Sequence, residues 1–114
     1  MRRLVTQLTG DDPETVATAL TVAMTAAATG FPVHLWLSGP AVLIAVPGQE
    51  PAYDLQNAPD RDEALDAMMS VSVCSPCAER RGLSQDDLRE GVKIAGAASL
   101  VEMLMADGTQ SLTY

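Results

Sequence analysis

The sequence predicts an α/β fold, in which a parallel sheet carries helices on both of its faces. Short runs rich in β-branched residues alternate along the whole chain with longer runs whose apolar residues recur at helical spacing. Such alternation is typical of consecutive β-α-β units, which bury a parallel sheet between two helical layers. A chain of 114 residues suits one compact domain, and we expect residues 1–114 to form it.

The first third of the chain predicts a strand, a helix and a second strand. Residues 2–9 have the β-rich composition of a strand, and residues 31–38 have the same character. Between them Asp12 is a suitable N-cap, Pro13 fits the first helical turn and Gly30 ends the helix. Five apolar residues of this helix share one face, which we expect to lie inward: Val16, Leu20, Ala23, Met24 and Ala27.

The segment GPAVLIAVPGQ, residues 39–49, is compatible with two structures. Its β-branched residues favour a strand, whereas the Gly-Pro and Pro-Gly pairs near its ends also frame a short helix. The polar residues 48–60 predict a loop. A helix is expected over residues 60–70, because Asp60 and Glu63 have the spacing of a capping box. Its expected inward face is Ala64, Leu65, Met68 and Met69.

Three strands and two helices complete the predicted order. The strands are expected at residues 70–74, 92–96 and 110–114, which are short β-rich runs. A short helix with a serine cap and a terminal glycine is expected at residues 84–91. A longer helix over residues 97–108 joins the last two strands. Its expected inward face is Leu100, Val101, Leu104 and Met105.

The charge balance argues against two classes of partner. Fifteen acidic and seven basic residues give a net charge of −8, which repels a phosphate backbone and an anionic membrane. We therefore expect neither nucleic acid nor membrane as a partner. The sequence has no recognisable signal peptide and no apolar run of membrane-spanning length, so we expect a cytoplasmic protein. In a reducing cytosol two cysteines are more often working thiols than a structural disulfide.

Cys74 ends the third predicted strand, at the edge of the sheet where parallel α/β folds bind their ligands. The segments after the first and second strands, residues 9–12 and 38–40, reach the same edge. We expect the start of a helical turn and the nearby Arg80 or Arg81 to lower the pKa of the Cys74 thiol. The alternative is that Cys74 is a small buried hydrophobic residue at a strand end.

Cys77 follows Cys74 by three residues, so the two share a face if a helical turn begins there. Cys77 can resolve a sulfur adduct on Cys74 as a disulfide, or it can simply fill the core. The sequence after it has a structural explanation as well. Arg80 and Arg81 suit the negative end of a helical turn, and Gly82 suits a left-handed cap.

Two other uses of a C-x-x-C pair are disfavoured. A structural zinc site needs more ligands than this pair and His34, which lies inside a predicted strand, can provide. A thioredoxin-like dithiol needs a later cis-proline loop, and no proline follows Pro76. We therefore expect no metal and no cofactor.

Three segments resemble the DsrE/DsrF-like family: VSVCSPCAERRGL, EGVKIAGAASLVEMLMADGTQSLTY and HLWLSGPAVLIA. The resemblance extends over nearly the whole chain. It implies a three-layer α/β/α sandwich around a five-stranded parallel sheet. It also favours the start of a helix over a strand for the GPAVLIA segment. Known members include sulfur-relay subunits of tRNA thiolation and of dissimilatory sulfur oxidation, as well as small stand-alone homologues.

The resemblance also implies a role for the thiols. The family's functional cysteine ends the third strand eight residues before the glycine of an Arg-Gly pair, and Cys74 holds that place relative to Gly82. Relay members accept a sulfane sulfur there as a persulfide and pass it on. Cys77 matches a second cysteine that many stand-alone members have and several relay subunits lack. The residues expected to bind around the thiols are Ser38, Gly39, Arg80, Arg81 and Gly82.

We therefore expect a cytoplasmic sulfur carrier, at most a sulfurtransferase-like enzyme, that exchanges sulfur with persulfide donor and acceptor proteins. The alternatives are a non-catalytic oligomeric binding module of the same fold and a redox sensor that uses Cys74 and Cys77. The resemblance implies homo-trimers or homo-hexamers. Trp36 and the apolar run at residues 41–46 add weaker support, because one small sheet could leave part of such a run uncovered. The alternative is that this run fills the monomer's own core.

Overall fold

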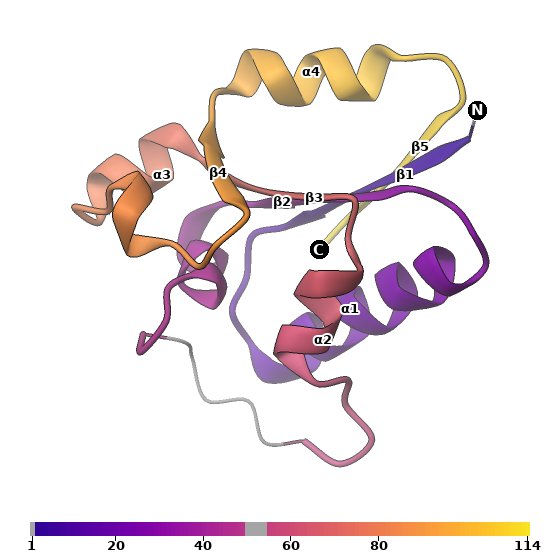
Figure 1. The fold of residues 1–114 in the computed structure, drawn as a ribbon, viewed down its shortest axis with the longest axis horizontal. Helices are drawn as coiled ribbons and strands as arrows, with labels where there is room; N and C mark the ends of the chain where they lie inside the picture. Colours follow the sequence, from indigo (N-terminus) through magenta and orange to yellow (C-terminus); the bar gives the residue numbers. More distant parts are fainter. Residues whose placement is uncertain (1, 50–54) are drawn as a thin grey trace.

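The computed structural model describes residues 2–49 and 55–114 and has three layers, with helices on both faces of one sheet (Figure 1). The sheet has five parallel strands in the order β4-β3-β2-β1-β5. The predicted fold class is therefore confirmed. The strands are β1 (Arg3–Leu8), β2 (Val33–Leu37), β3 (Ser70–Cys74), β4 (Val92–Ala95) and β5 (Thr109–Thr113).

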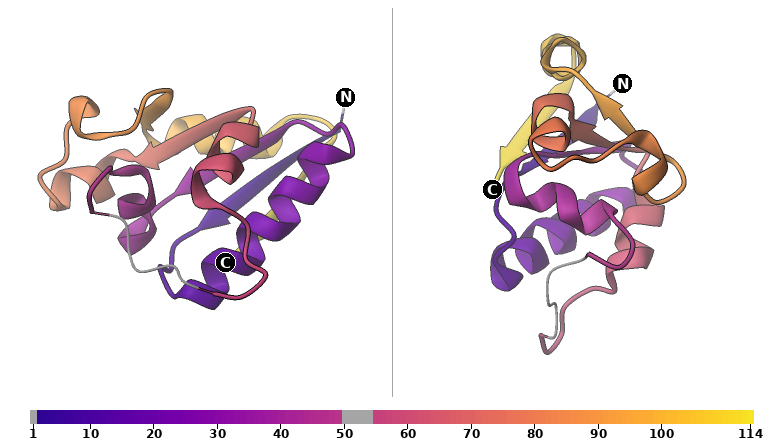
Figure 2. Two further views of the ribbon diagram at one scale, coloured as in Figure 1. Left: turned by 60° about the horizontal axis from the view of Figure 1, so that its bottom comes forward. Right: turned by 90° about the vertical axis from the view of Figure 1, so that its left-hand side faces the viewer.

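The direction in which the chain moves across the sheet decides where the helices lie. From β1 to β4 each new strand is added on the same side of the last, so right-handed crossovers place their helices on one face. That face carries α1 (Pro13–Ala28), the 3₁₀ helix η1 (Gly39–Ala45) and α2 (Arg61–Ala67). The step from β4 to β5 runs the other way, and α4 (Ala97–Met105) accordingly lies on the opposite face (Figure 2).

The hydrophobic core lies between the sheet and the layer formed by α1, η1 and α2. Leu35 and Val73 from the sheet and Val16 and Leu20 from α1 are almost completely buried in one cluster. The local signals at the ends of α1 act as predicted. Asp12 accepts a hydrogen bond from the backbone N–H of Thr15, and Gly30 follows the helix with φ +96°. Of the predicted inward face, Met24 and Ala27 are only partly buried.

The ambiguous apolar segment forms the 3₁₀ helix η1, as the family resemblance implied and against its local β propensity. Ala41, Val42, Ile44 and Ala45 are all buried in the core. A helix fits here because Gly39 and Pro40 begin it directly after β2, where the chain must turn away from the sheet. Of the predicted loop at residues 48–60, residues 50–54 lie outside the described residues, and residues 55–60 form no helix or strand.

Two helices differ from their predictions. The helix expected at residues 84–91 is only the 3₁₀ turn η2 (Gln85–Asp87), because the Ser84–Asp87 capping box closes immediately and Leu88 is already extended. Asp60 caps α2 through the backbone N–H of Glu63, as expected. The predicted burial of Met69 is wrong, since α2 ends at Ala67 and Met69 is exposed on the way to β3.

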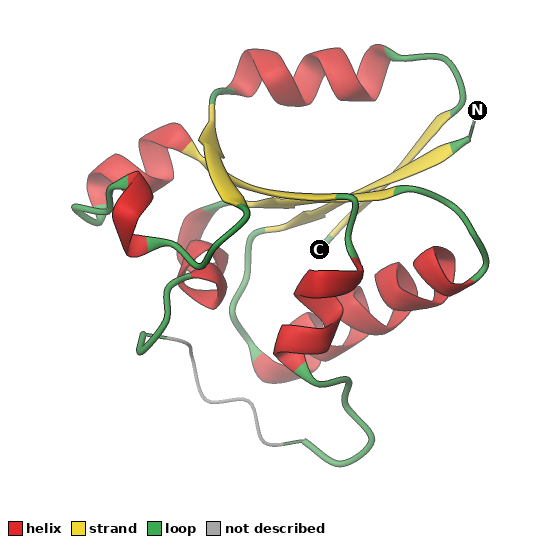
Figure 3. Cartoon of the chain, in the orientation of Figure 1, coloured by secondary structure: helices red, strands yellow, loops and turns green. Residues whose placement is uncertain are grey.

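The predicted inward face of α4 is also wrong. Leu100 and Leu104 are half-buried, but Val101 is 54% and Met105 77% exposed. A nine-residue helix is about 14 Å long, whereas the five strands span about 19 Å from one edge to the other. This helix must cross the whole face alone, as Figure 3 shows, so its outward side has nothing to pack against in the monomer.

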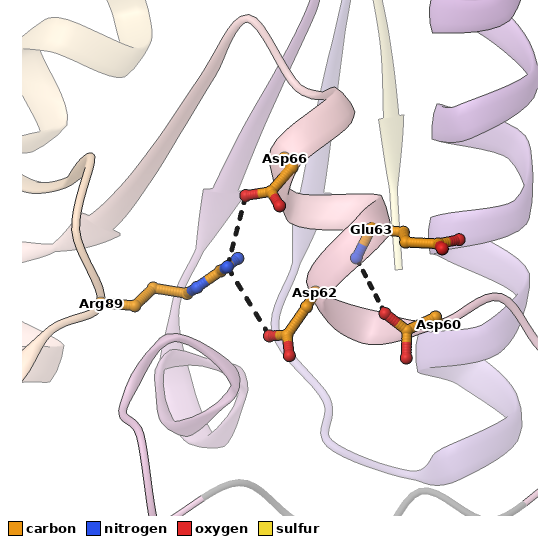
Figure 4. A network of polar contacts seen from close by, with 5 residues as sticks. All are labelled: Asp60, Asp62, Glu63, Asp66 and Arg89. Carbon is orange, nitrogen blue, oxygen red and sulfur yellow. Dashed lines mark hydrogen bonds and ion pairs between the residues drawn. The ribbon is translucent and has the colours of Figure 1, made fainter.

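Arg89 ties the segment before β4 to α2 (Figure 4). Its Nη2 donates to Oδ1 of Asp66 at 3.3 Å and lies 3.6 Å from Oδ1 of Asp62. The backbone N–H of Arg89 also donates to the carbonyl of Ala45 at 2.9 Å. Both aspartates are largely exposed, so each ion pair contributes roughly 0–1 kcal/mol. The backbone contact therefore adds a second link, which joins the approach to β4 to η1.

None of the helices in the described part of the chain combines the length and the apolar composition that a membrane crossing requires.

Candidate functional site

The ends of β2 and β3 bring several of the predicted site residues together. Cys74 is the last residue of β3 and the N-cap of α3 (Ser75–Arg80), whose first turn carries Cys77. Ser38 and Gly39 follow β2 directly, and Gly39 begins η1. Because β2 and β3 pair in parallel, their ends meet at one edge of the sheet, where α3 packs against η1. The thiols and the start of η1 therefore form one site.

Cys77 is buried among groups that donate hydrogen bonds to its sulfur. The backbone N–H of Gly39 donates to Sγ at 3.2 Å, and Nη1 of Arg80 approaches the same sulfur at 3.8 Å. Burial raises the pKa of Cys77, but the Gly39 N–H and the adjacent Cys74 thiol outweigh this effect. The positive charges of Arg80 and Arg81 act in the same direction, so the pKa of Cys77 lies below its ordinary value.

Cys74 is half-buried, and its pKa is shifted in the opposite direction. Burial raises the pKa of Cys74, and the neighbouring Cys77 sulfur raises it further by repelling a second negative charge. The backbone N–H of Cys77 and the guanidinium of Arg80 oppose this rise without reversing it. The expectation of a lowered pKa for Cys74 is therefore wrong, because burial and the neighbouring Cys77 sulfur outweigh the helix start and Arg80.

Gly39 is the residue at which backbone geometry sets the position of the donor. It has φ +52°, and an added Cβ would lie 3.0 Å from Cγ2 and 3.3 Å from the carbonyl oxygen of Thr9. The hydroxyl groups of Ser38 and Thr9 are hydrogen-bonded at 2.9 Å. Ser38 therefore joins the end of β2 to the end of β1 and helps to hold the Gly39 N–H toward the sulfur.

Thr9 is a site residue that the sequence prediction missed. Its carbonyl oxygen accepts the backbone N–H of Ala41 at 3.1 Å, and its hydroxyl holds Ser38. The available signal was its place directly after the first strand, at the edge where ligands bind in parallel sheets. Position alone could not distinguish it from the polar residues that follow it.

Arg81 and Gly82 have structural roles at the end of α3. Nη1 of Arg81 donates to the carbonyl oxygen of Cys77 at 3.1 Å. Gly82 has φ +66°, and its N–H donates to the carbonyl of Glu79 at 3.1 Å. Gly82 therefore forms the left-handed cap that the sequence predicts. Of the residues expected to bind around the thiols, Gly39 and Arg80 contact a sulfur directly.

His34 lies on β2 and is paired with a serine. Its Nδ1 is 2.7 Å from Oγ of Ser70, and its pKa is lowered by burial and then by the charge of Arg3. Within residues 2–49 and 55–114, no three side chains of His, Cys, Asp or Glu gather as a metal site would require. The chemistry of the site therefore rests on its two sulfur atoms.

The two thiols differ in acidity and in accessibility. The pKa of Cys77, whose surface is only 6% exposed, is lowered, whereas the pKa of Cys74, the more accessible sulfur, is raised, so Cys77 ionises before Cys74. A thiol that donates a hydrogen bond to a neighbouring thiolate can lose its proton to that neighbour when it reacts. The arrangement can therefore support nucleophilic sulfur exchange at Cys74, with Cys77 as the local acceptor of its proton.

Sequence comparisons with known proteins give matches of two kinds. The model of the DsrE/DsrF-like family matches residues 3–113. The uncharacterized protein MK0008 of Methanopyrus kandleri is 33% identical over 88 residues, a match that covers 77% of this chain and 73% of the relative. The uncharacterized protein MJ0989 of Methanocaldococcus jannaschii has the same identity over 88 residues and is covered to 77%, as is this chain.

Two solved structures have a similar fold along their full lengths. The YchN protein of E. coli matches with a TM-score of 0.80 and 24% identity over 100% of both chains. Protein MTH1491 of Methanobacterium thermoautotrophicum matches with a TM-score of 0.79 and 19% identity, again over 100% of both chains. At these identities the likeness supports the fold alone.

The substitution Gly39→Ala should both destabilise the protein and raise the pKa of Cys77. A side chain at φ +52° costs about 1–2 kcal/mol. Its Cβ would also crowd Thr9, so the start of η1 must shift and carry the N–H away from the sulfur. Urea unfolding measures the first effect. Ultraviolet absorption of the thiolate against pH, in a Cys74→Ser background, measures the second.

Gly82→Ala is the matched control. Gly82 has a similar φ of +66°, but nothing lies near its missing Cβ and its N–H does not bond a sulfur. It should therefore lose a similar amount of stability while the pKa of Cys77 stays unchanged. Equal pKa shifts in the two variants would show that the Gly39 N–H does not set the acidity of Cys77.

The pKa values of the two thiols should lie on opposite sides of the pKa of a free cysteine. Because the pKa of Cys77 is lowered and that of Cys74 is raised, thiolate absorption should rise in two steps, one below and one above the ordinary value. Cys77→Ser should remove the lower step and move the Cys74 inflection back toward that value, since the neighbouring charge is gone. One step with two equivalents at the value of a free cysteine would contradict this assignment.

Proposed function

Because this chain belongs to the DsrE/DsrF-like family, we propose that it carries sulfane sulfur as a persulfide on Cys74 and delivers it to an acceptor thiol. The observation that carries this proposal is the pairing of an accessible thiol with a buried thiol whose pKa is lowered. Cys74 is half-buried, whereas Cys77 is buried and accepts the N–H of Gly39. An incoming persulfide therefore reaches Cys74 first.

In the loading step, Cys74 attacks the outer sulfur of a donor persulfide, R–S–SH. The donor's S–S bond breaks, a new S–S bond forms on Cys74, and the donor leaves as the thiolate RS⁻. The proton of Cys74 moves to the Cys77 thiolate during the attack and then to the departing RS⁻. This transfer allows a thiol of raised pKa to act as a nucleophile, and it restores the charge on Cys77.

Two release routes follow from the loaded state. In the first, the thiolate of an acceptor protein attacks the outer sulfur, and Cys74 leaves as the thiolate. In the second, the Cys77 thiolate attacks Sγ of Cys74, so that a Cys74–Cys77 disulfide forms and hydrosulfide, HS⁻, departs. The second route needs a dithiol reductant to restore the thiols. We propose the cytoplasm as the compartment, because its thiol pools can serve both routes.

A dithiol redox sensor is the second candidate. The lowered pKa of Cys77 beside a second thiol favours it, since the thiolate is the form that attacks oxidants and disulfides. The two functions differ in their product. A sensor forms the Cys74–Cys77 disulfide with an oxidant and gains no sulfur, whereas a carrier gains the mass of one sulfur atom from a persulfide donor.

We also propose a homo-oligomer, a trimer or a dimer of trimers, as the family resemblance implies. Trp36 and the run at residues 41–46 give no independent support. Trp36 is buried within the monomer on the sheet face under α4, and the run packs in the monomer's core, with Leu43 only partly buried. A different surface gives such support. Val101 and Met105 on the outward side of α4 are exposed, and gathered apolar residues on a surface often mark an interface.

The cysteine variants separate the roles of the two sulfurs. Cys74→Ser should abolish the gain of sulfur, because it removes the attacking atom, and the fold should survive the exchange of one sulfur for one oxygen. Cys77→Ser should still load, more slowly at neutral pH, and should lose hydrosulfide release through the disulfide. Intact mass after incubation with a persulfide donor measures both. A Cys74→Ser protein that loads while Cys77→Ser does not would reverse the assignment.

The assembly is tested at the outward side of α4. Size exclusion with light scattering at micromolar concentration should give the mass of a trimer or hexamer for the wild-type protein. Met105→Glu places a charge on the apolar surface and should shift the mass toward the monomer. Met69→Glu is the control, since Met69 is similarly exposed on the segment between α2 and β3. A monomeric wild-type protein would remove the assembly proposal and leave the sulfur proposal standing.

A further inference from the structure

The face of the sheet under α4 holds a cavity that is lined by both apolar and charged side chains and by neither cysteine. In register, Ser72 of β3 pairs with Trp36 of β2 and with Lys93 of β4, and paired residues of parallel strands point to the same face. A cavity of about 560 Å³ lies between this face and α4. Its lining includes Arg3, Ser72, Lys93, Ser99, Glu102 and Met103.

The cavity lies along one side of α4. No residue of α4 is fully buried, and Ser99, Glu102, Met103 and Ala106 line the cavity at helical spacing, while Leu100 and Leu104 beside them are half-buried. The volume falls within the roughly 300–1,000 Å³ that is typical of small-molecule sites. The space is therefore large enough for an organic ligand rather than a single ion.

The charges around the cavity are unusual for this protein. The chain carries a net charge of −8 and has a single lysine, Lys93. Arg89 pairs with aspartates, and Arg80 and Arg81 contact Cys77. In contrast, Arg3 and Lys93 form no ion pair with any residue in the described ranges, and both line the cavity.

The carboxylate of Glu102 in the same cavity limits the net charge that a ligand can carry. Glu102 lines the cavity with the two cations, so the three charges sum to +1. A bound monoanion neutralises this sum, whereas a polyanion would be repelled by Glu102. The hydroxyl groups of Ser72 and Ser99 can donate to an oxyanion, and the carboxylate of Glu102 can accept from a hydroxyl group.

We propose that this cavity binds a small aliphatic monoanion that carries a carboxylate at one end and a hydroxyl group at the other. Arg3 and Lys93 attract the carboxylate, Glu102 accepts the hydroxyl, and Ile94 and Met103 contact the aliphatic body. The site is distinct from the thiols, because neither cysteine lines it. The inference therefore stands independently of the proposed sulfur transfer.

Three matched probes test the ligand class by NMR titration of the amide resonances. They are 6-hydroxyhexanoate, hexanoate, which lacks the hydroxyl, and 1,6-hexanediol, which lacks the carboxylate. The protein is the Cys74→Ser, Cys77→Ser double variant, so that no thiol reaction occurs. We expect saturable shifts at Ser72, Lys93 and Ser99 with 6-hydroxyhexanoate, binding of hexanoate that is roughly threefold weaker, and no saturation with the diol.

Single substitutions then assign the contacts. Arg3→Gln and Lys93→Gln should each weaken the binding of 6-hydroxyhexanoate roughly threefold, which is the effect expected for a partly exposed charge pair. Glu102→Met should weaken binding of 6-hydroxyhexanoate but tighten binding of hexanoate, because it removes both the acceptor of the hydroxyl group and a repulsive charge. Arg2→Gln is the control and should change neither, since Arg2 does not line this cavity.

Two results would overturn the proposal. Equal binding of the three probes would mean that the cavity is only an apolar cleft, and an absence of saturable shifts at its lining residues would mean that it takes no such ligand. The comparison of probes on one protein decides the question even if a single substitution disturbs the fold. Because the titrated protein has no thiols, neither result bears on the persulfide proposal.

Discussion

The handedness of parallel crossovers is the constraint on which the rest of this structure depends. A right-handed connection must place its helix on a face that is set by the direction of the next strand. Four strands added in one direction give the α1, η1 and α2 layer, and the single reversal to β5 sends α4 to the other side. The core is therefore one-sided. Leu35 and Val73 face three helical segments, whereas Ser72 and Lys93 face the cavity under one short helix.

The same topology produces the thiol site. Because β2 and β3 are neighbours, the start of η1 and the start of α3 meet beyond their ends, and a backbone N–H of the first reaches a sulfur of the second. That contact joins Gly39 to Cys77, residues that are 38 positions apart. It helps to make the buried thiol more acidic than the accessible one. A carrier benefits from this division, since the accessible thiol can react while the ionised form of the buried thiol accepts its proton.

The helix α4 has two different sides, and each has its own consequence. Ser99 and Glu102 line the cavity and Leu100 and Leu104 are half-buried, while the outer side exposes Val101 and Met105. An amphipathic helix normally turns its apolar residues toward its own sheet. In α4 apolar residues lie on both sides, so those on the outer side are free to contact another surface. The arrangement of α4 therefore underlies both the proposed assembly and the proposed ligand site.

The sequence by itself determined the order of the elements, the fold class, the caps at Asp12 and Gly30 and the position of Cys74 at a strand end. These features depend on spacing and on contacts within a few residues, so a linear pattern records them. The tertiary structure alone decided which thiol is the more acidic, that Thr9 supports the start of η1, and that Val101 and Met105 of α4 face outward. Burial and pKa depend on groups that arrive from distant strands, and no local pattern specifies those neighbours.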